Sequence, residues 1–286
     1  MLRVLLVSSR PLSWINTAYP FGLAYLLLAQ PLSPVVLLVG FLYFLVPYNL
    51  AMYGINDVFD YESDLRNPRK GGVEGAVLAP RHHRAVLLAA AATNLPFLVV
   101  LVLLGGPTSW LVLAVSVFAV VAYSAPRLRF KERPVLDSVT SSVHFVSPAA
   151  YAVSLTARPP DARTVLLLTA FFCWGMASHA FGAVQDVPAD RSAGIGSVAT
   201  AFGAAATVRL AALLYAASGV LAALSGWPTD LAALAAVPYL VMVAPYLSLR
   251  DQEAERANGG WRRFLAINYG AGAFVTILAV AIAASG

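Results

Sequence analysis

Long apolar stretches, separated by clusters of charge, proline and glycine, form the main pattern along this chain. Each stretch reaches the length of about 20 residues that an α-helix needs to cross the hydrocarbon core of a bilayer. Segments of about 10 residues with alternating polarity, as in an outer-membrane barrel, do not occur. The pattern therefore predicts nine transmembrane helices, near residues 13–30, 34–55, 84–104, 108–125, 135–156, 164–182, 201–225, 230–248 and 263–284.

The composition supports a polytopic membrane protein. Of the 286 residues, 59% are hydrophobic and 12% are charged, and the mean hydropathy is +0.74. Soluble domains carry about 25% charged residues. Because backbone polar groups in hydrocarbon have to be satisfied within their own segment, the long apolar windows are predicted to be α-helices. We therefore expect one all-α membrane domain over residues 1–286.

The basic residues predict the orientation of the chain in the cell membrane. Of the 19 Lys and Arg residues, all except Arg158 and Arg163 fall in the N-terminus or in connections on the same side. The positive-inside rule then puts the N-terminus in the cytoplasm and the C-terminus outside. The same loop bias accounts for the net charge of +5, so the charge indicates no nucleic-acid partner.

Two acidic clusters lie at helix ends on the predicted cytoplasmic side. The first places Asn56, Asp60 and Asp64 four residues apart, on one side of a helix that continues through them. The second places Asp186 and Asp190 at the same spacing. A single helix end rich in Asp is often solvated surface, but acids at a helix C-terminus oppose the helix dipole. Two such clusters on one face favour a bound cation, and carboxylate and amide oxygens suit Mg²⁺.

Basic residues beside these clusters indicate a site for a diphosphate. Metal ions bridge carboxylates to phosphate oxygens, and Lys and Arg neutralise the remaining charge. Each base taken singly is also explained as an ordinary positive-inside residue. The candidates are Arg66, Lys70, Arg191 and the run that contains Arg127, Arg129 and Lys131.

In combination these motifs resemble the UbiA superfamily of intramembrane prenyltransferases, over essentially the whole chain. The matching elements are Asn56-x3-Asp60-x3-Asp64, Asp186-x3-Asp190 and Tyr123-x3-Arg127. The family has Lys at the last of these positions, so Arg127 keeps the charge but replaces a point charge with a bidentate donor. The resemblance implies a nine-helix bundle with a central cavity and an active-site mouth that faces the cytoplasm. Within the superfamily, segments such as YGINDVFDYESDLRNPRKGG are similar to the bacterial lycopene elongases of C50 carotenoid synthesis.

The resemblance also implies roles for named side chains. The Mg²⁺ ligands would be Asn56, Asp60, Asp64, Asp186 and Asp190, and Tyr123 would join the four aspartates in the catalytic set. The bases that hold the diphosphate of an allylic donor would be Arg10, Arg66, Lys70, Arg127 and Lys131. The donor would ionise in a dry site, and the cation would be attacked by a lipophilic acceptor drawn from the bilayer lipids. Other enzymes of carotenoid synthesis are the partner proteins that such a role suggests.

Two histidines inside predicted helices are candidates for taking up the final proton. Ionisable groups in spans usually face a bundle interior or a functional cavity. His179 precedes Asp186 by seven residues and therefore lies on a similar helix face. His144 joins the catalytic candidates, although a neutral histidine bonded to a neighbouring helix is the simpler interpretation of either residue.

The sequence leaves alternatives open for the identity of the acceptor and for the class of function. No Lys or Arg lies deep in a predicted span, which favours an apolar acceptor over an acidic one. An aromatic or quinone precursor remains the alternative acceptor. A cation or metabolite transporter is a second class, although transporter sites tend to lie near the membrane midplane. A non-catalytic lipid-binding or scaffold protein is a third.

Overall fold

The computed structural model describes residues 1–65, 77–156 and 159–285, and in these ranges the chain forms α-helices and short 3₁₀-helices with no strand. The all-α prediction is confirmed. The chain divides into two compact units. Unit 1 comprises Met1–Phe130 with His144–Pro159, and unit 2 comprises Lys131–Val143 with Pro160–Gly286. The single domain over residues 1–286 stays a prediction.

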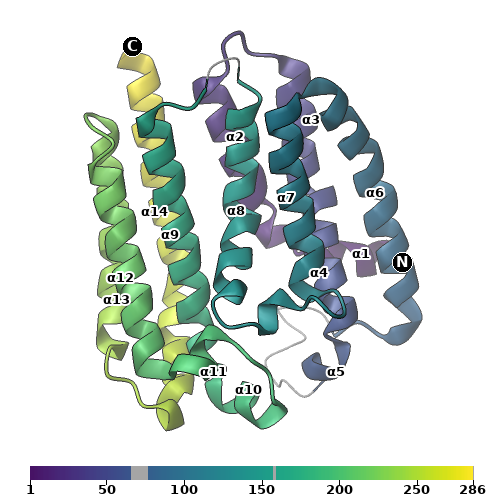
Figure 1. The fold of residues 1–286 in the computed structure, drawn as a ribbon, viewed down its shortest axis with the longest axis vertical. Helices are drawn as coiled ribbons and strands as arrows, with labels where there is room; N and C mark the ends of the chain where they lie inside the picture. The colour runs from purple at the N-terminus through teal and green to yellow at the C-terminus, as the bar shows by residue number, and fades with distance from the viewer. Residues whose placement is uncertain (66–76, 157–158, 286) are drawn as a thin grey trace. The chain divides into compact units, whose positions relative to one another are not determined.

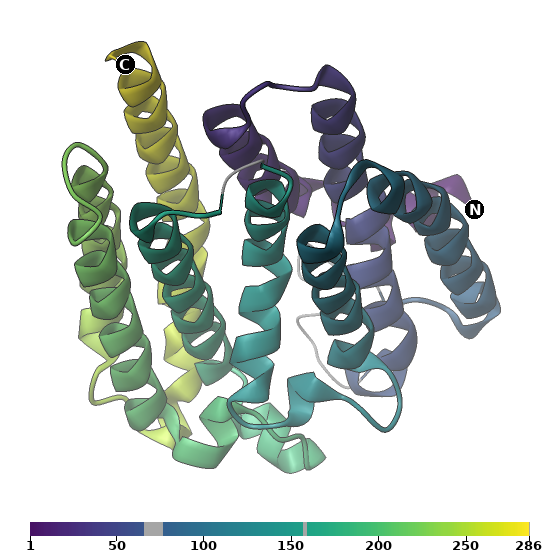
Figure 2. The same cartoon turned by 45° about the horizontal axis from the view of Figure 1, so that its top comes forward.

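Unit 1 is built around helix α4, which packs against α1, α3, α6 and α7. Figure 2 shows α2 and α3 as neighbouring helices joined by a short connection. Proline opens α3, α4 and α7, at the position where a missing N–H costs a helix no hydrogen bond. The helices are α1 (Leu2–Ser8), α2 (Ile15–Leu28), α3 (Pro34–Leu45), α4 (Pro47–Phe59), α5 (Tyr61–Asp64), α6 (His83–Leu104), α7 (Pro107–Ser124) and the later turns of α8 (Leu136–Ser154).

The junction between α3 and α4 divides a segment that the sequence predicts as one helix, residues 34–55. Pro47 has no N–H to donate and interrupts the helical ladder. The carbonyl of Phe44, in the last turn of α3, accepts hydrogen bonds from Thr17 Oγ1 at 2.6 Å and Asn49 Nδ2 at 2.8 Å. Asn49 Nδ2 also reaches Thr17 Oγ1 at 2.7 Å. Buried side chains therefore supply hydrogen bonds to the backbone at the break, as a membrane interior requires. The same bonds fix α2 to the start of α4.

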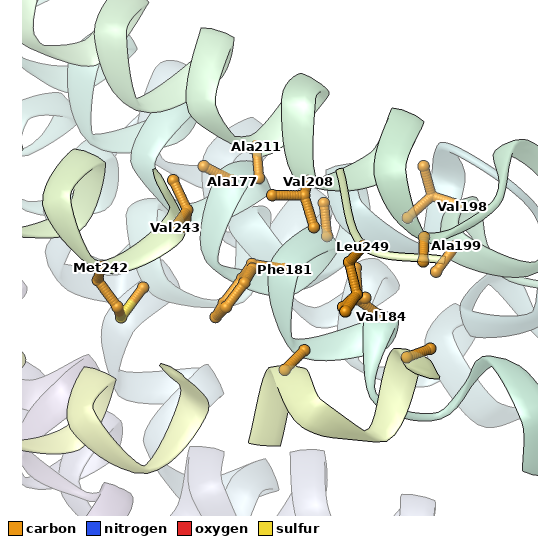
Figure 3. Packing of buried hydrophobic residues seen from close by; sticks show 14 of the residues in the cluster. Ala177, Phe181, Val184, Val198, Ala199, Val208, Ala211, Met242, Val243 and Leu249 are labelled. Carbon is orange, nitrogen blue, oxygen red and sulfur yellow. The ribbon is translucent and has the colours of Figure 1, made fainter. Parts of the chain in front are cut away.

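Unit 2 is built on α9 and α12, which pack along their lengths, as Figure 1 shows. Small residues on both helices, among them Ala177 and Ala211, allow close approach. In Figure 3 Phe181 and Val184 of α9 lie in one buried cluster with Val208 of α12. The helices are α9 (Ala162–Val184), α10 (Val187–Ala193), α11 (Val198–Phe202), α12 (Ala204–Ala223), α13 (Ala236–Val243), α14 (Asn258–Ser285) and the first turns of α8, with 3₁₀-helices at Thr229–Ala235, Ala244–Tyr246 and Asp251–Ala257.

Seven segments of the described residues are long and apolar enough to cross a membrane, so the chain is a multi-pass membrane protein. They are Pro34–Phe59, Pro80–Leu104, Pro107–Ser124, Ala162–Val184, Ala204–Ala223, Thr229–Tyr246 and Asp251–Ala284. The predicted spans near 13–30 and 135–156 are not among them. Helix α2 has only 14 residues, and α8 carries Asp137, His144 and several serines, which lower its hydropathy.

Candidate functional site

The first acidic motif lies where α4 ends. Asn56 is in the last turn of α4, and its carbonyl accepts a hydrogen bond from the N–H of Asp60 at 2.9 Å. Asp60 is the residue that follows the helix, and only 4% of it is exposed. The chain then turns and starts the short helix α5, which ends at Asp64. The motif therefore does not run along one continuous helix, so the spacing alone does not align Asp64 with Asn56 and Asp60.

The structure describes no side chain for three residues of this region that were predicted to belong to the site. The backbone of Asp64 closes α5, but its side chain is not among those described. Arg66 and Lys70 both fall in residues 66–76, outside the described residues. Their roles in metal and diphosphate binding stay predictions.

The end of α7 meets the first motif through Ser124. The buried Ser124 donates a hydrogen bond from Oγ to Oδ1 of Asn56 at 2.9 Å. A carbonyl oxygen has two lone pairs, so this bond orients the Asn56 amide oxygen and leaves it capacity for another partner. Ser124 follows Tyr123 of the Tyr-x3-Arg motif directly. It was not predicted as a site residue, because a serine in an apolar helix carries no distinct signal.

Arg129 approaches Asp60 at the end of α4. Its Nη1 donates to the carbonyl of Phe59 at 3.4 Å, and its Nη2 lies 3.9 Å from Oδ1 of Asp60. A cation at the last carbonyls of α4 interacts favourably with the helix dipole. Arg127, the predicted diphosphate ligand of this run, is exposed. Lys131 lies in the 3₁₀-helix Phe130–Glu132 and belongs to unit 2.

Tyr123 and His144, two of the predicted catalytic residues, lie side by side in unit 1. Their rings meet edge to face, with centroids 5.1 Å apart. His144 is 3% exposed, and its carbonyl accepts a hydrogen bond from the hydroxyl of Tyr48 at 3.4 Å. The structure thus places His144 in a packed aromatic environment between α7 and α8.

Arg10 lies between α1 and α2 and binds Asp57. This residue follows Asn56 of the first motif directly and was not predicted as a site residue. Nη2 of Arg10 donates to Oδ1 of Asp57 at 3.0 Å, and Asp57 has no exposed surface. The guanidinium also lies 4.3 Å from the centre of the Tyr53 ring, in cation–π geometry. The signal for Asp57 was present, since it is the first of the four acids that follow α4's apolar run.

The second acidic motif lies where α9 ends. Helix α9 stops at Val184, and Asp186 is the residue that directly precedes α10. The N–H of Asp190 donates to the carbonyl of Asp186 at 2.8 Å, which places the two aspartates one turn apart in unit 2. Gln185, between the two helices, accepts a hydrogen bond at Oε1 from Asn258 Nδ2 at 2.6 Å.

Arg191 anchors α10. Its Nη1 contacts Oδ2 of Asp251 at 2.7 Å, and its Nη2 donates to the carbonyl of Thr200 at 3.1 Å. The other oxygen of Asp251 accepts from the N–H of Ala204 at 2.7 Å, at the start of α12. The arginine therefore fixes the helix that carries Asp190, a role that the sequence alone did not indicate.

Asp137 and His179 form a second pairing in unit 2. Asp137 has no exposed surface, and its Oδ2 lies 3.8 Å from Nε2 of His179. No sequence motif indicated a role for Asp137, although it is the one acid in the predicted span 135–156.

The two motifs offer the type of ligand atom that Mg²⁺ prefers. Each motif offers hard oxygen ligands, the amide and carboxylate of Asn56 and Asp60 in unit 1 and the carboxylates of Asp186 and Asp190 in unit 2. Mg²⁺ binds through one or two carboxylates, keeps several waters and contacts substrate phosphates, so a small protein ligand set is sufficient. Within the described ranges, no three His, Cys, Asp or Glu side chains are gathered in a group that could hold a metal by themselves.

Unit 1 also contains an apolar cavity of about 240 Å³ between α3, α4, α6 and α7. Its lining includes Tyr43, Ile55, Leu98 and Val120. The predicted central cavity of a nine-helix bundle stays a prediction.

Comparisons with known proteins confirm the family that these sequence motifs resemble. A family model described as "UbiA prenyltransferase family" matches residues 18–284. A lycopene elongase/hydratase of Corynebacterium glutamicum is 52% identical to this chain over 281 residues, which cover 98% of each protein. The C(50) beta-cyclic carotenoids biosynthesis protein LbtBC of a Dietzia species is 56% identical over 277 residues, which cover 96% of this chain and 64% of LbtBC.

Among solved structures, a UbiA homolog from Archaeoglobus fulgidus bound to DMAPP and Mg²⁺ matches with a TM-score of 0.68. The match covers 93% of this chain and 98% of that one, at 18% sequence identity. The similarity shows a shared fold.

Proposed function

The chain belongs to the UbiA prenyltransferase family, and from this we propose that it transfers an isoprenyl group from dimethylallyl diphosphate to lycopene in C50 carotenoid synthesis. Family membership confirms the predicted enzyme class, a prenyltransferase. Lycopene as acceptor is supported by the Corynebacterium glutamicum relative, and the donor by the homolog solved with DMAPP.

The observation that carries the proposal is the matched placement of the two acidic motifs. Asn56 and Asp60 lie at the end of α4, and Asp186 and Asp190 follow the end of α9. Oxygen ligands at the ends of long apolar helices suit a substrate with a charged head and a hydrocarbon tail. A transporter site at the membrane midplane is not supported by this placement.

We propose that these four residues, together with Asp64, bind Mg²⁺. When bound, Mg²⁺ neutralises the charge that develops on the leaving diphosphate. Ser124 holds the Asn56 amide oxygen in place, and Arg191 fixes α10 with its Asp190. Arg10, Arg66, Lys70, Arg127 and Lys131 stay the proposed diphosphate bases, and the position of Arg129 beside Asp60 adds it to that set.

The proposed reaction proceeds through ionisation of the allylic C–O bond. The terminal alkene of the acceptor attacks the allylic cation, and the new tertiary cation then loses a proton or takes up water. The site has to exclude water during the first step, because water would trap the allylic cation. Tyr123 and His144, whose rings are in contact in unit 1, stay the proposed catalytic side chains beside the aspartates.

For the membrane arrangement we propose nine spans, with α2 and α8 as the two additional ones. The N-terminus would then lie in the cytoplasm and the C-terminus outside, so that both acidic motifs face the cytoplasm. The distribution of Lys and Arg supports this orientation. The short α2 is accommodated by local thinning of the bilayer or by burial against α3.

The acceptor is tested by expressing the chain in a host that accumulates lycopene and by analysing its lipids by mass spectrometry. We expect a carotenoid heavier than lycopene by one or two isoprenyl units. Unchanged lycopene together with a prenylated quinone or aromatic compound would overturn the choice of acceptor and favour the alternative prenyltransferase.

A further inference from the structure

Asp137 is a buried carboxylate that is tightly held at the start of α8. Its Oδ1 accepts hydrogen bonds from the N–H of Ser138 at 2.7 Å and from the hydroxyl of Ser138 at 3.3 Å. Its Oδ2 accepts from the N–H of Val198 at 2.7 Å, at the first residue of α11. These three hydrogen bonds engage both carboxylate oxygens and fix the side chain of Asp137 inside unit 2.

The side chain of His179 of α9 faces this carboxyl group. Its Nε2 lies 3.8 Å from Oδ2 of Asp137, and its side chain is 20% exposed. A carboxylate at this distance attracts the imidazolium that forms when the ring takes up a proton. Ionisable groups inside membrane spans are costly and usually functional.

The position of His179 along α9 matches the proposed reaction. His179 lies in α9 five residues before its last residue, Val184, and Asp186 follows that helix end by two residues. With a diphosphate at Asp186, the reacting carbon of a five-carbon donor, and the acceptor end that attacks it, would lie on the α9 side of Asp186. The new tertiary cation would form at the depth of His179.

We propose that His179 is the base that completes the reaction and that Asp137 is its positioning residue. This step rests on the proposed prenyl transfer. The C–H bond next to the cationic carbon breaks, its electron pair forms the new C=C bond, and the proton goes to the His179 imidazole. When water adds instead, its oxygen forms the C–O bond and the same imidazole takes the water proton.

The test compares the purified wild-type protein in lipid nanodiscs with His179→Gln, Asp137→Asn and the matched control Ser197→Ala. Ser197 caps α11 by accepting a hydrogen bond from Thr200 N–H at 3.1 Å, next to the Val198 N–H that Asp137 holds. Its loss weakens α11 without touching His179. For each protein, folding is checked by thermal melting, and the rate and end groups of the prenylated product are measured by mass spectrometry and NMR.

We expect His179→Gln to lower product formation by about 100-fold, the usual effect of losing a general base, and to change the ratio of alkene isomers and hydroxyl end groups. Asp137→Asn should change the same ratio, and Ser197→Ala should leave it as in the wild type. A wild-type rate and product ratio in folded His179→Gln would overturn the proposal. Equal changes in Asp137→Asn and Ser197→Ala would overturn the positioning role of Asp137.

If Asp137→Asn does not fold, the result for His179→Gln decides alone. If the wild-type protein prenylates another acceptor, the proposed function fails, but that product also requires loss of a proton. The comparison of its end groups between the wild type and His179→Gln then still decides the role of His179.

Discussion

Arg10 donates a hydrogen bond from Nη2 to Oδ1 of Asp57 across 3.0 Å, and this carboxylate has no exposed surface. The pair connects the segment between α1 and α2 to the last turn of α4, one turn before Asp60. The backbone of Arg10 has a φ of 49°, in the left-handed region that costs a non-glycine residue energy. The ion pair and the Tyr53 ring offset that cost, so Arg10 supports the first motif structurally whatever it contributes to diphosphate binding.

Replacement of Asp57 by Asn is expected to destabilise the protein. Removing one partner of a buried ion pair leaves the other without compensation and costs about 3 kcal/mol or more. The thermal midpoint in detergent should fall accordingly. The matched control is Glu253→Gln, because the pair of Glu253 with Arg256 at 3.3 Å is exposed and such pairs contribute about 0–1 kcal/mol. Equal midpoints for both variants would contradict a structural role of the Arg10–Asp57 pair.

Replacement of Ser124 by Ala is expected to weaken metal binding without unfolding the protein. The hydroxyl orients the Asn56 amide oxygen, and loss of a partner that orients a metal ligand typically lowers affinity by 10-fold to 100-fold. The Mg²⁺ concentration for half-maximal activity should rise by about 10-fold. Ser192→Ala, which removes an exposed hydroxyl bonded to the Ala189 carbonyl, is the control. An unchanged Mg²⁺ requirement would remove Asn56 from the ligand set.

Arg191 and Asp251 are expected to act as one unit. Arg191→Ala and Asp251→Asn each release α10, so both should raise the Mg²⁺ requirement of the enzyme. In the double variant the effects should not add, and the coupling energy should be about 0.5 kcal/mol or more, as for residues in direct contact. Fully additive effects would show that the contact does not fix α10.

The sequence was sufficient to place both acidic motifs at helix ends, because apolar runs and charge clusters are local patterns. The motifs around Asn56, Asp60, Asp186 and Asp190 therefore identified the family, which the comparisons confirm. The break of the helix at Asp60 was not foreseen, since nothing in the spacing distinguishes a continuous helix from one that ends and restarts.

Pairings between distant residues could not be predicted. Asp57 with Arg10 and Asp137 with His179 join residues 47 and 42 positions apart, and no local pattern encodes which helices become neighbours. The same holds for Arg129, which approaches Asp60 only because the chain after α7 returns to the end of α4. Among the described residues, seven of the nine predicted spans are long and apolar enough to cross a membrane. Of the other two, α2 is short, and the polar side chains of α8 lower its hydropathy.

Asp161 lies at the opposite end of α9 from His179. Its contribution to the stability of the protein depends on pH. Its Oδ1 accepts from the N–H of Thr164 at 2.8 Å and caps the helix. The hydrogen bond with Thr164, and then the nearby Arg163, lower the pKa of Asp161 below its ordinary value. A carboxyl with a lowered folded-state pKa stabilises the protein above its unfolded pKa, about 3.9, and this stability is lost as the pH falls through the folded-state pKa.

Replacement of Asp161 by Ala should therefore lower stability by about 1 kcal/mol at pH 7, the usual cost of losing a helix cap. Below the folded-state pKa the difference from the wild type should shrink. Thermal melts in detergent between pH 3 and pH 7 measure both effects. A difference that stays constant over this range would show that the Asp161 charge does not contribute to the cap.

The most direct test of the account measures diphosphate release from dimethylallyl diphosphate by the purified protein with lycopene, with and without Mg²⁺. The wild type and the control Asp161→Asn should release diphosphate only when Mg²⁺ is present. Asp60→Asn and Asp186→Asn should each lose activity by about 100-fold or more, the effect of removing one group that stabilises charge in a transition state. Near-wild-type release by both folded variants, or release without Mg²⁺, would contradict the assignment of the two acidic motifs as the metal site.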